Sequence, residues 1–130
     1  GPLNTMGSIL IVGAGGAIGS MLRFWVGSRV TEAMGSEFAW GTLTVNIAGS
    51  FLIGFLAFVI NTKTPLGELL RLGLIVGVLG GFTTFSAFSA ETVTLLLSQQ
   101  WLRAVTYISA SVLLCIFAAT AGMAAGRQFS

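Results

Sequence analysis

Long uncharged runs dominate this sequence and limit what the chain can fold into. Residues 38–62, 72–90 and 104–126 contain no Asp, Glu, Lys or Arg, and no charged side chain precedes Arg23. A helix needs about 20 mostly apolar residues to cross the hydrocarbon core of a bilayer. The charge pattern therefore predicts helices that span a membrane.

The composition agrees with a protein that faces lipid. Charged residues make up 8% of the chain and hydrophobic residues 55%, whereas a soluble domain carries about 25% charged residues. The six Lys and Arg residues are scattered singly, so the sequence offers no basic patch for nucleic acid. It contains no histidine and no recognisable catalytic dyad or cluster of metal ligands, so nothing in it indicates an enzyme.

The uncharged runs predict an all-α integral membrane fold with four transmembrane helices, in a single membrane domain over residues 1–130. We expect the spans at about 7–29, 38–61, 68–98 and 101–126. Residues 1–3, Gly-Pro-Leu, are expected to be a scar left by protease cleavage of a recombinant protein, and they carry no weight for the fold.

The third hydrophobic region is too long for one straight span. Its middle contains Gly80-Gly81, followed by the hydroxyl side chains of Thr83, Thr84 and Ser86. We expect a break near residues 80–86. Irregular backbone survives at membrane depth only where it is buried in protein or lines a wet cavity. The sequence therefore predicts that function is concentrated at this break.

Small residues recur at a spacing of four, which lets helix backbones approach closely in a membrane. The repeats are Gly15 and Gly19, then Gly73, Gly77 and Gly81, then Gly122 and Gly126. We expect these faces to pack helices together and assign them no further role.

The basic residues are balanced between the two ends of a four-helix bundle. One end carries Lys63, Arg71 and Arg127, and the other carries Arg23, Arg29 and Arg103. Orientation normally follows an excess of Lys and Arg on the cytoplasmic side. Without a bias the chain can insert in both orientations, which permits an antiparallel dimer.

Polar groups within the spans are rich in hydrogen-bond donors. Thr42, Asn46 and Ser50 share one helix face, and Tyr107 and Ser111 lie one turn apart in the last span. An amide in a membrane must satisfy several donor and acceptor sites, so Asn46 is either an interhelical contact or a pore ligand.

Such a lining suits an anion, because a cation path normally carries intramembrane Asp or Glu. Phe85 and Phe88 lie beside the expected break. The electropositive edges of their rings would favour a small anion.

The sequence resembles the small bacterial fluoride channels, the Fluc (CrcB) family, over essentially its whole length. Three segments carry the resemblance, and the last is the most specific. They are Gly15-Gly16-Ala17-Ile18-Gly19-Ser20-Met21-Leu22-Arg23-Phe24, Trp40-Gly41-Thr42-Leu43-Thr44-Val45-Asn46, and Gly80-Gly81-Phe82-Thr83-Thr84-Phe85-Ser86-Ala87-Phe88-Ser89-Ala90-Glu91.

The resemblance implies a homodimer of opposite orientations in the bacterial inner membrane, with two antiparallel pores that export fluoride passively. It implies that Asn46 donates to fluoride, that Phe85 and Phe88 present ring edges to each pore, and that Arg23 attracts anions near a vestibule. The resemblance assigns a polar track to Thr42, Ser86, Tyr107 and Ser111.

The resemblance also implies a structural sodium ion on the two-fold axis of the dimer. Its ligands would be the backbone carbonyls of Gly80 and Thr83 from both subunits. Cys115 lies one turn beyond Ser111, but a thiol is a poor donor and is not expected to extend the track. Glu91 lies within the motif, and the sequence identifies no partner for it.

Two other kinds of protein remain as alternatives. A small multidrug or guanidinium exporter of four spans would be expected to carry a Glu in its first span, and residues 7–29 contain none. A non-transporting structural subunit would leave Asn46 and the two phenylalanines without a role.

Overall fold

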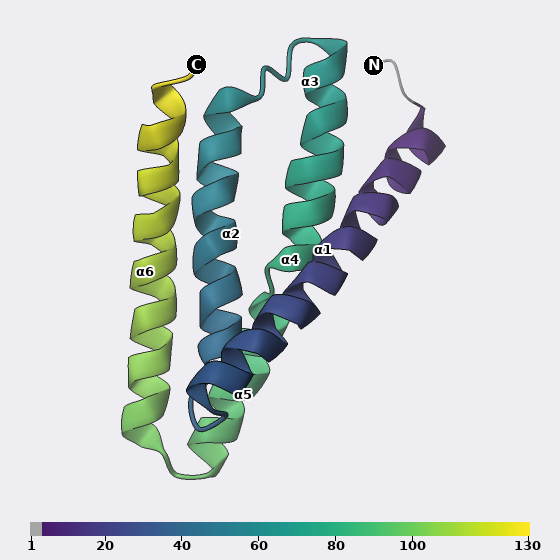
Figure 1. Ribbon diagram of the computed structural model, residues 1–130. Coiled ribbons are helices and arrows are strands. Elements are labelled where there is room, and N and C mark those ends of the chain that lie inside the picture. The colour runs from purple at the N-terminus through teal and green to yellow at the C-terminus, as the bar shows by residue number, and fades with distance from the viewer. Residues whose placement is uncertain (1–3) are drawn as a thin grey trace.

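The computed structural model describes residues 4–130, so the expected cleavage scar at residues 1–3 lies outside the described residues. The chain folds into helices joined by short connections (Figure 1). They are α1 (Thr5–Met34), α2 (Trp40–Val59), α3 (Pro65–Leu70), η1 (Arg71–Leu79), α4 (Gly80–Phe82), α5 (Phe85–Leu97) and α6 (Trp101–Arg127).

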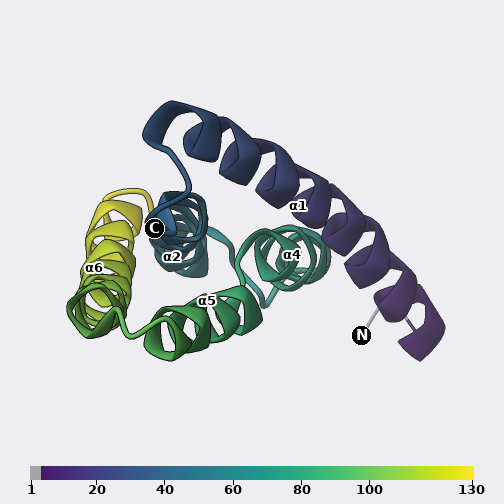
Figure 2. The same ribbon diagram turned by 90° about the horizontal axis from the view of Figure 1, so that it is seen from below.

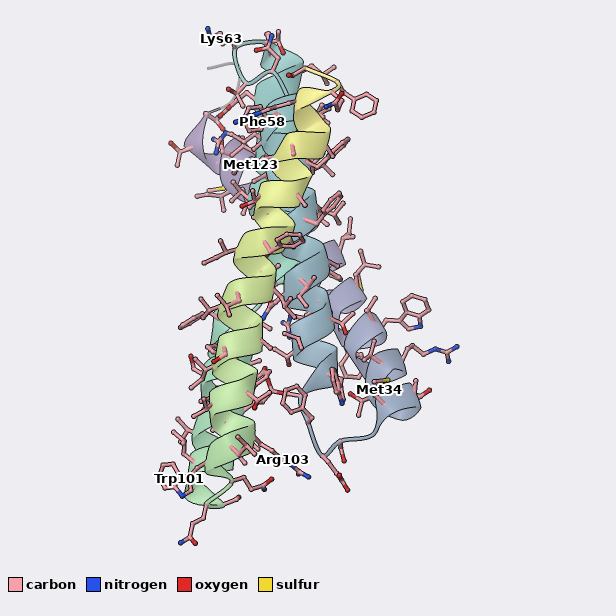
Figure 3. The ribbon with its side chains drawn as sticks, turned by 90° about the vertical axis from the view of Figure 1, so that its left-hand side faces the viewer. Met34, Phe58, Lys63, Trp101, Arg103 and Met123 are labelled. Carbon is pink, nitrogen blue, oxygen red and sulfur yellow. The ribbon has the colours of Figure 1, made fainter. Side chains whose placement is uncertain are left out.

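Four helical regions are long and apolar enough to cross a membrane: Thr5–Met34, Trp40–Val59, Pro65–Leu97 and Trp101–Arg127. The predicted all-helical fold with four membrane-spanning segments is confirmed. Most large apolar side chains on these helices are exposed, and Figure 3 shows them projecting outward along the helices. In a membrane these side chains would contact lipid.

Local capping sets the ends of several helices. α1 begins at Thr5 because the Asn4 side chain accepts a hydrogen bond from the N–H of Gly7 at 2.7 Å. The helix continues past the predicted limit of 29 and stops at Met34, where Gly35 adopts a φ of 87°. A residue other than glycine rarely tolerates that conformation.

The helices are arranged so that successive connections lie at opposite ends of the molecule. α2 and α6 lie side by side, while α1 crosses the bundle obliquely and packs on η1 and α4 (Figures 1 and 2). The start of α1, the α2–α3 connection and the C-terminus lie at one end, and the α1–α2 and α5–α6 connections lie at the other.

Glycines form the closest helix contacts. A Cβ added to Gly15 would meet the carbonyl oxygen of Gly73, and a Cβ added to Gly122 would meet the carbonyl oxygen of Phe51. α1 therefore packs on η1, and α6 on α2, with backbones nearly touching, as small residues permit in a membrane.

The third span changes conformation along its length. Residues 71–79 form wide π-helical turns, and α4 then ends at Phe82. Thr83 (φ −94°, ψ 157°) and Thr84 (φ −153°, ψ 114°) are extended. α5 starts at Phe85, with the Thr84 hydroxyl accepting from the N–H of Ala87 at 3.1 Å. Short π-helical pieces occur frequently at functional sites.

Candidate functional site

The side chain of Asn46 holds the extended residues of the third span. Its Nδ2 donates to the carbonyl of Thr84 at 3.1 Å, and its Oδ1 accepts from the N–H of Thr84 at 2.8 Å. The sequence left Asn46 as either an interhelical contact or a pore ligand, and the structure shows the interhelical contact. The second hydrogen of Nδ2 remains available for another acceptor.

This pairing frees a backbone carbonyl in α4. In a continuous helix the Gly80 carbonyl would accept from the N–H of Thr84, but that N–H donates to Asn46. The Thr83 hydroxyl donates to the Leu79 carbonyl at 2.9 Å. In a continuous helix the Thr83 carbonyl would accept from the N–H of Ala87, but that N–H donates to the Thr84 hydroxyl. Carbonyls of this kind are hard oxygen ligands for a cation.

A cavity of about 460 Å³, here called the inner cavity, lies beside these residues. It brings together nine residues that the sequence singled out. They are Asn46, Ser50, Gly80, Thr83, Thr84, Phe85, Phe88, Ser111 and Cys115. Within residues 4–130, no charged side chain lines it.

Two phenyl rings form part of the wall of the inner cavity. The ring centroids of Phe85 and Phe88 lie 5.3 Å apart at an interplanar angle of 51°. Phe85 is 77% exposed, whereas Phe88 is 9% exposed. Phe88 is thus fixed by the core, while Phe85 is free to contact another molecule.

Ser111 places an unpaired hydroxyl at the inner cavity. Its Oγ is buried and has no hydrogen-bond partner among residues 4–130. Buried polar groups are nearly always paired, and leaving one unpaired is unfavourable by about 1–3 kcal/mol. An unpaired donor in the wall of a cavity is therefore a candidate ligand for a bound acceptor.

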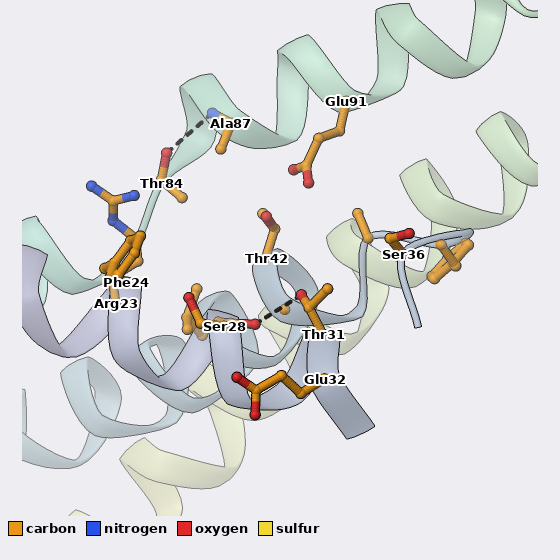
Figure 4. Close-up of a pocket in the computed structure, with 15 residues that line it drawn as sticks. Arg23, Phe24, Ser28, Thr31, Glu32, Ser36, Thr42, Thr84, Ala87 and Glu91 are labelled. Carbon is orange, nitrogen blue, oxygen red and sulfur yellow. Dashed lines mark hydrogen bonds between the residues drawn. The ribbon is translucent and has the colours of Figure 1, made fainter. Parts of the chain in front are cut away.

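A second cavity of about 550 Å³, here called the outer cavity, lies on the other side of Thr84. Figure 4 shows Arg23, Thr42, Thr84 and Glu91 facing it. Arg23 Nε donates to the Gly81 carbonyl at 3.0 Å, which ties α1 to α4 and leaves the other guanidinium donors for other acceptors.

Tyr107 lies in the core that includes Phe88. It is fully buried, with its ring edge-on to Phe38 at a centroid distance of 5.4 Å and 5.2 Å from the Phe88 centroid. Its hydroxyl donates to Glu91 Oε1 at 3.1 Å, so Glu91 has the partner that the sequence did not reveal. Nothing in the spacing of residues 91 and 107 pointed to this contact.

Two residues of the expected polar track, Tyr107 and Ser86, line neither cavity. The Oγ of Ser86 lies 3.3 Å from Oγ1 of Thr84, which lines both cavities. The structure thus gathers Asn46, Ser111 and the phenyl rings at the inner cavity and Arg23 and Thr42 at the outer one.

A bundle of four apolar helices, with polar groups gathered beside the extended residues Thr83 and Thr84, is the architecture of a small multi-pass membrane transport protein. The family model of CrcB-like proteins, Camphor Resistance (CrcB), matches residues 10–123. The chain therefore belongs to the CrcB family, and the resemblance inferred from its sequence is confirmed.

Curated bacterial relatives support this assignment. The chain is 52% identical over 122 residues to the "Fluoride-specific ion channel FluC" of Rhizobium meliloti (strain 1021), which covers 94% of this chain and 98% of the relative. The proteins of the same name from Caulobacter vibrioides (strain NA1000 / CB15N) and Magnetococcus marinus are 45% and 43% identical. Those matches cover 95% and 89% of this chain, and 98% and 94% of the relatives.

The predicted location, as a multi-pass protein of the bacterial inner membrane, agrees with these relatives and with the four apolar helices.

Proposed function

We infer that this protein is a fluoride-selective ion channel that lets fluoride leave the cytoplasm passively. The unpaired, buried Ser111 hydroxyl in the wall of an inner cavity without charged side chains carries this proposal. The relatives, all named fluoride-specific ion channels, support it.

The donors of the inner cavity suit a small, strongly hydrated anion. Fluoride that loses its water needs replacement donors at close range. Ser111 offers one hydroxyl, Asn46 the second hydrogen of Nδ2, and Phe85 and Phe88 their electropositive ring edges. A cation would find no carboxylate in this wall.

We assign the interrupted third span as the centre of the pore. Asn46 stabilises the extended backbone at Thr84, so the polar break is held by protein rather than exposed to lipid. Arg23, which shares the outer cavity with the carboxylates of Glu32 and Glu91, would supply the positive charge that attracts anions, and Thr42 would offer them a hydroxyl donor. Ser111 at the inner cavity belongs to the proposed polar track. We also assign Tyr107 and Ser86 to it, which line neither cavity in the single subunit.

The working unit proposed here is an antiparallel homodimer with two pores. The equal basic counts at the two ends support insertion in both orientations. The exposed Phe85 beside the inner cavity is the kind of apolar side chain that a second subunit would cover.

A sodium ion on the dimer axis is part of the same proposal. The Gly80 carbonyl has lost its helical donor to Asn46, and Gly80 and Thr83 both line the inner cavity. Four such carbonyls, two from each subunit, would suit a hard cation. The ion would supply a fixed positive charge between the two pores.

A cation exporter is the less favoured alternative. The acidic residues near the proposed path, Glu32 and Glu91, both line the outer cavity. Neither lines the inner cavity, where a membrane-embedded acidic site for a cation would be expected.

Fluoride efflux from liposomes tests the proposed function. Vesicles containing the purified protein and potassium fluoride are treated with a potassium ionophore, and a fluoride electrode follows the release. We expect rapid release that depends on the ionophore, and no release of chloride from matched vesicles. Fluoride release that instead needs a proton gradient, or equal release of chloride, would rule out a passive selective channel.

A further inference from the structure

We propose that the hollow between the α1–α2 connection and the start of α6 binds the headgroup of a phosphatidylethanolamine lipid. This hollow, here called the interfacial pocket, has a volume of about 780 Å³. Its lining combines apolar and oppositely charged side chains. The apolar residues include Met34, Phe38, Trp40 and Leu102, and the charged residues are Glu37 and Arg103.

The two charged side chains belong to different elements of the fold and face each other. Glu37 belongs to the connection after α1, and Arg103 to the first turn of α6. Arg103 Nη2 lies 3.7 Å from Glu37 Oε2, and their side chains are 50% and 86% exposed. An exposed pair this loose contributes little, at most about 1 kcal/mol. Arg103 Nη1 also donates to Gln100 Oε1 at 3.0 Å, in an exposed contact within the first turn of α6. A phosphate would therefore replace both of these exposed partners of Arg103.

The pocket lies where the helices of a membrane protein leave the hydrocarbon. Figure 3 shows Trp101 and Arg103 at the same end of the molecule as Met34, opposite Lys63. Trp101 is exposed at the start of α6, and Trp40 lines the pocket at the start of α2. Tryptophan is enriched at the level of lipid headgroups. In a membrane this pocket would therefore face the layer of lipid headgroups.

The pair of charges selects among headgroups. A guanidinium binds phosphate through two parallel hydrogen bonds, and Arg103 can offer them to the lipid phosphate. Glu37, beside it, would repel a headgroup with net negative charge but would accept hydrogen bonds from a primary ammonium. Phosphatidylethanolamine carries both groups. Phosphatidylcholine has no N–H to donate, and phosphatidylglycerol has no cation.

The first turn of α6 adds donors on the phosphate side. No side chain caps this helix at Gln100. The N–H groups of its first turn therefore lack a side-chain acceptor. Helix N-termini favour anions. The phosphate position next to Arg103 is therefore favoured by the backbone as well as by the guanidinium, while the apolar side chains of the pocket contact the upper acyl chains.

Native mass spectrometry of the detergent-purified protein, mixed with equal amounts of the three lipids, tests this site. We expect phosphatidylethanolamine to be retained several-fold more than phosphatidylcholine or phosphatidylglycerol. Arg103→Gln should reduce its retention by about tenfold, because a charged hydrogen-bond partner of the phosphate is lost. Glu37→Gln should remove the preference over phosphatidylglycerol.

Arg29→Gln is the matched control. Arg29 forms a similarly exposed pair with Glu32 at 3.9 Å but does not line the interfacial pocket, so its loss should leave lipid retention unchanged. Circular dichroism checks that each variant is folded. Equal retention of the three lipids by the wild-type protein, or the same loss in Arg29→Gln as in Arg103→Gln, would overturn the proposal. If Arg103→Gln does not fold, Glu37→Gln tests the proposal alone. A Glu37→Gln variant that still prefers phosphatidylethanolamine over phosphatidylglycerol would then overturn it.

Discussion

The side chain of Asn46 is hydrogen-bonded to both main-chain polar groups of Thr84, donating to the carbonyl at 3.1 Å and accepting from the N–H at 2.8 Å. The amide thereby replaces the helical partners that the third span lacks at this point. It also joins α2 to the start of α5, across 38 residues of sequence. One side chain from another helix thus pairs the extended main chain at Thr84.

Asn46→Ala should therefore destabilise the protein. The substitution removes both hydrogen bonds and leaves the N–H and the carbonyl of Thr84 unpaired, at about 1–3 kcal/mol for each group. Unfolding in detergent, followed by circular dichroism, measures the change. Asn61→Ala is the control, because the Asn61 side chain accepts a single exposed hydrogen bond, from the Lys63 N–H. Equal stabilities of the two variants would contradict the structural role of Asn46.

Ser111→Ala should separate stability from transport. Removing a buried hydroxyl that has no partner should leave the free energy of unfolding unchanged or raise it by about 1 kcal/mol. If the hydroxyl serves fluoride, the same variant should slow fluoride efflux at least tenfold, which corresponds to about 1.4 kcal/mol.

Thr92→Val should have the opposite effect, a loss of stability without a loss of fluoride efflux. Thr92 is also buried, but its hydroxyl donates to the Phe88 carbonyl at 2.8 Å, so it needs no ligand. Its loss should cost about 1 kcal/mol of stability and leave fluoride efflux near the wild-type rate. Wild-type efflux in Ser111→Ala would show that Ser111 does not contact the ion.

The two phenylalanines of the inner cavity should respond differently to substitution by Ile. Phe85 is mostly exposed within the single chain, so Phe85→Ile should abolish fluoride efflux with little loss of stability. Phe88 packs on Tyr107 at a centroid distance of 5.2 Å, so Phe88→Ile should abolish efflux and also destabilise the core by about 1–3 kcal/mol. Efflux and thermal unfolding, measured on the same preparations, distinguish the two. Full efflux in Phe85→Ile would exclude its ring from the pore.

Packing of α1 on the third span predicts a large effect from one added methyl group. A Cβ at position 19 would meet the carbonyl oxygen of Val78, whereas a Cβ at position 13 would have nothing within 4 Å. Gly19→Ala should cost about 1–3 kcal/mol of stability, since the two backbones must separate. Gly13→Ala should cost nothing measurable. Thermal unfolding in detergent compares them, and equal melting temperatures would show that α1 packs elsewhere.

The sequence was sufficient to predict the four apolar spans, because a helix that crosses the hydrocarbon core needs a long run of residues without charge. The π-helical turns of residues 71–79 were not predicted, since α- and π-helical turns share the same apolar composition. Asn46 stood out as an amide within a span, but its partner at Thr84 did not. That contact depends on how α2 packs beside the third span.

The contact between Tyr107 and Glu91 was hidden for a similar reason. The two residues lie on successive helices, α5 and α6, and meet only because a short connection turns the chain back on itself. Sequence spacing predicts neighbours within one helix, whereas the meeting of two helices is set by tertiary packing.

The reversal potential of the protein in a planar bilayer tests the central claim most directly. With fluoride on one side, chloride on the other and the same cation on both, a fluoride-selective channel passes current at zero voltage. The account predicts a reversal potential far from zero, with the sign of fluoride moving down its gradient, and loss of this current in Phe85→Ile. A reversal potential near zero, or one that follows an imposed proton gradient, would contradict it.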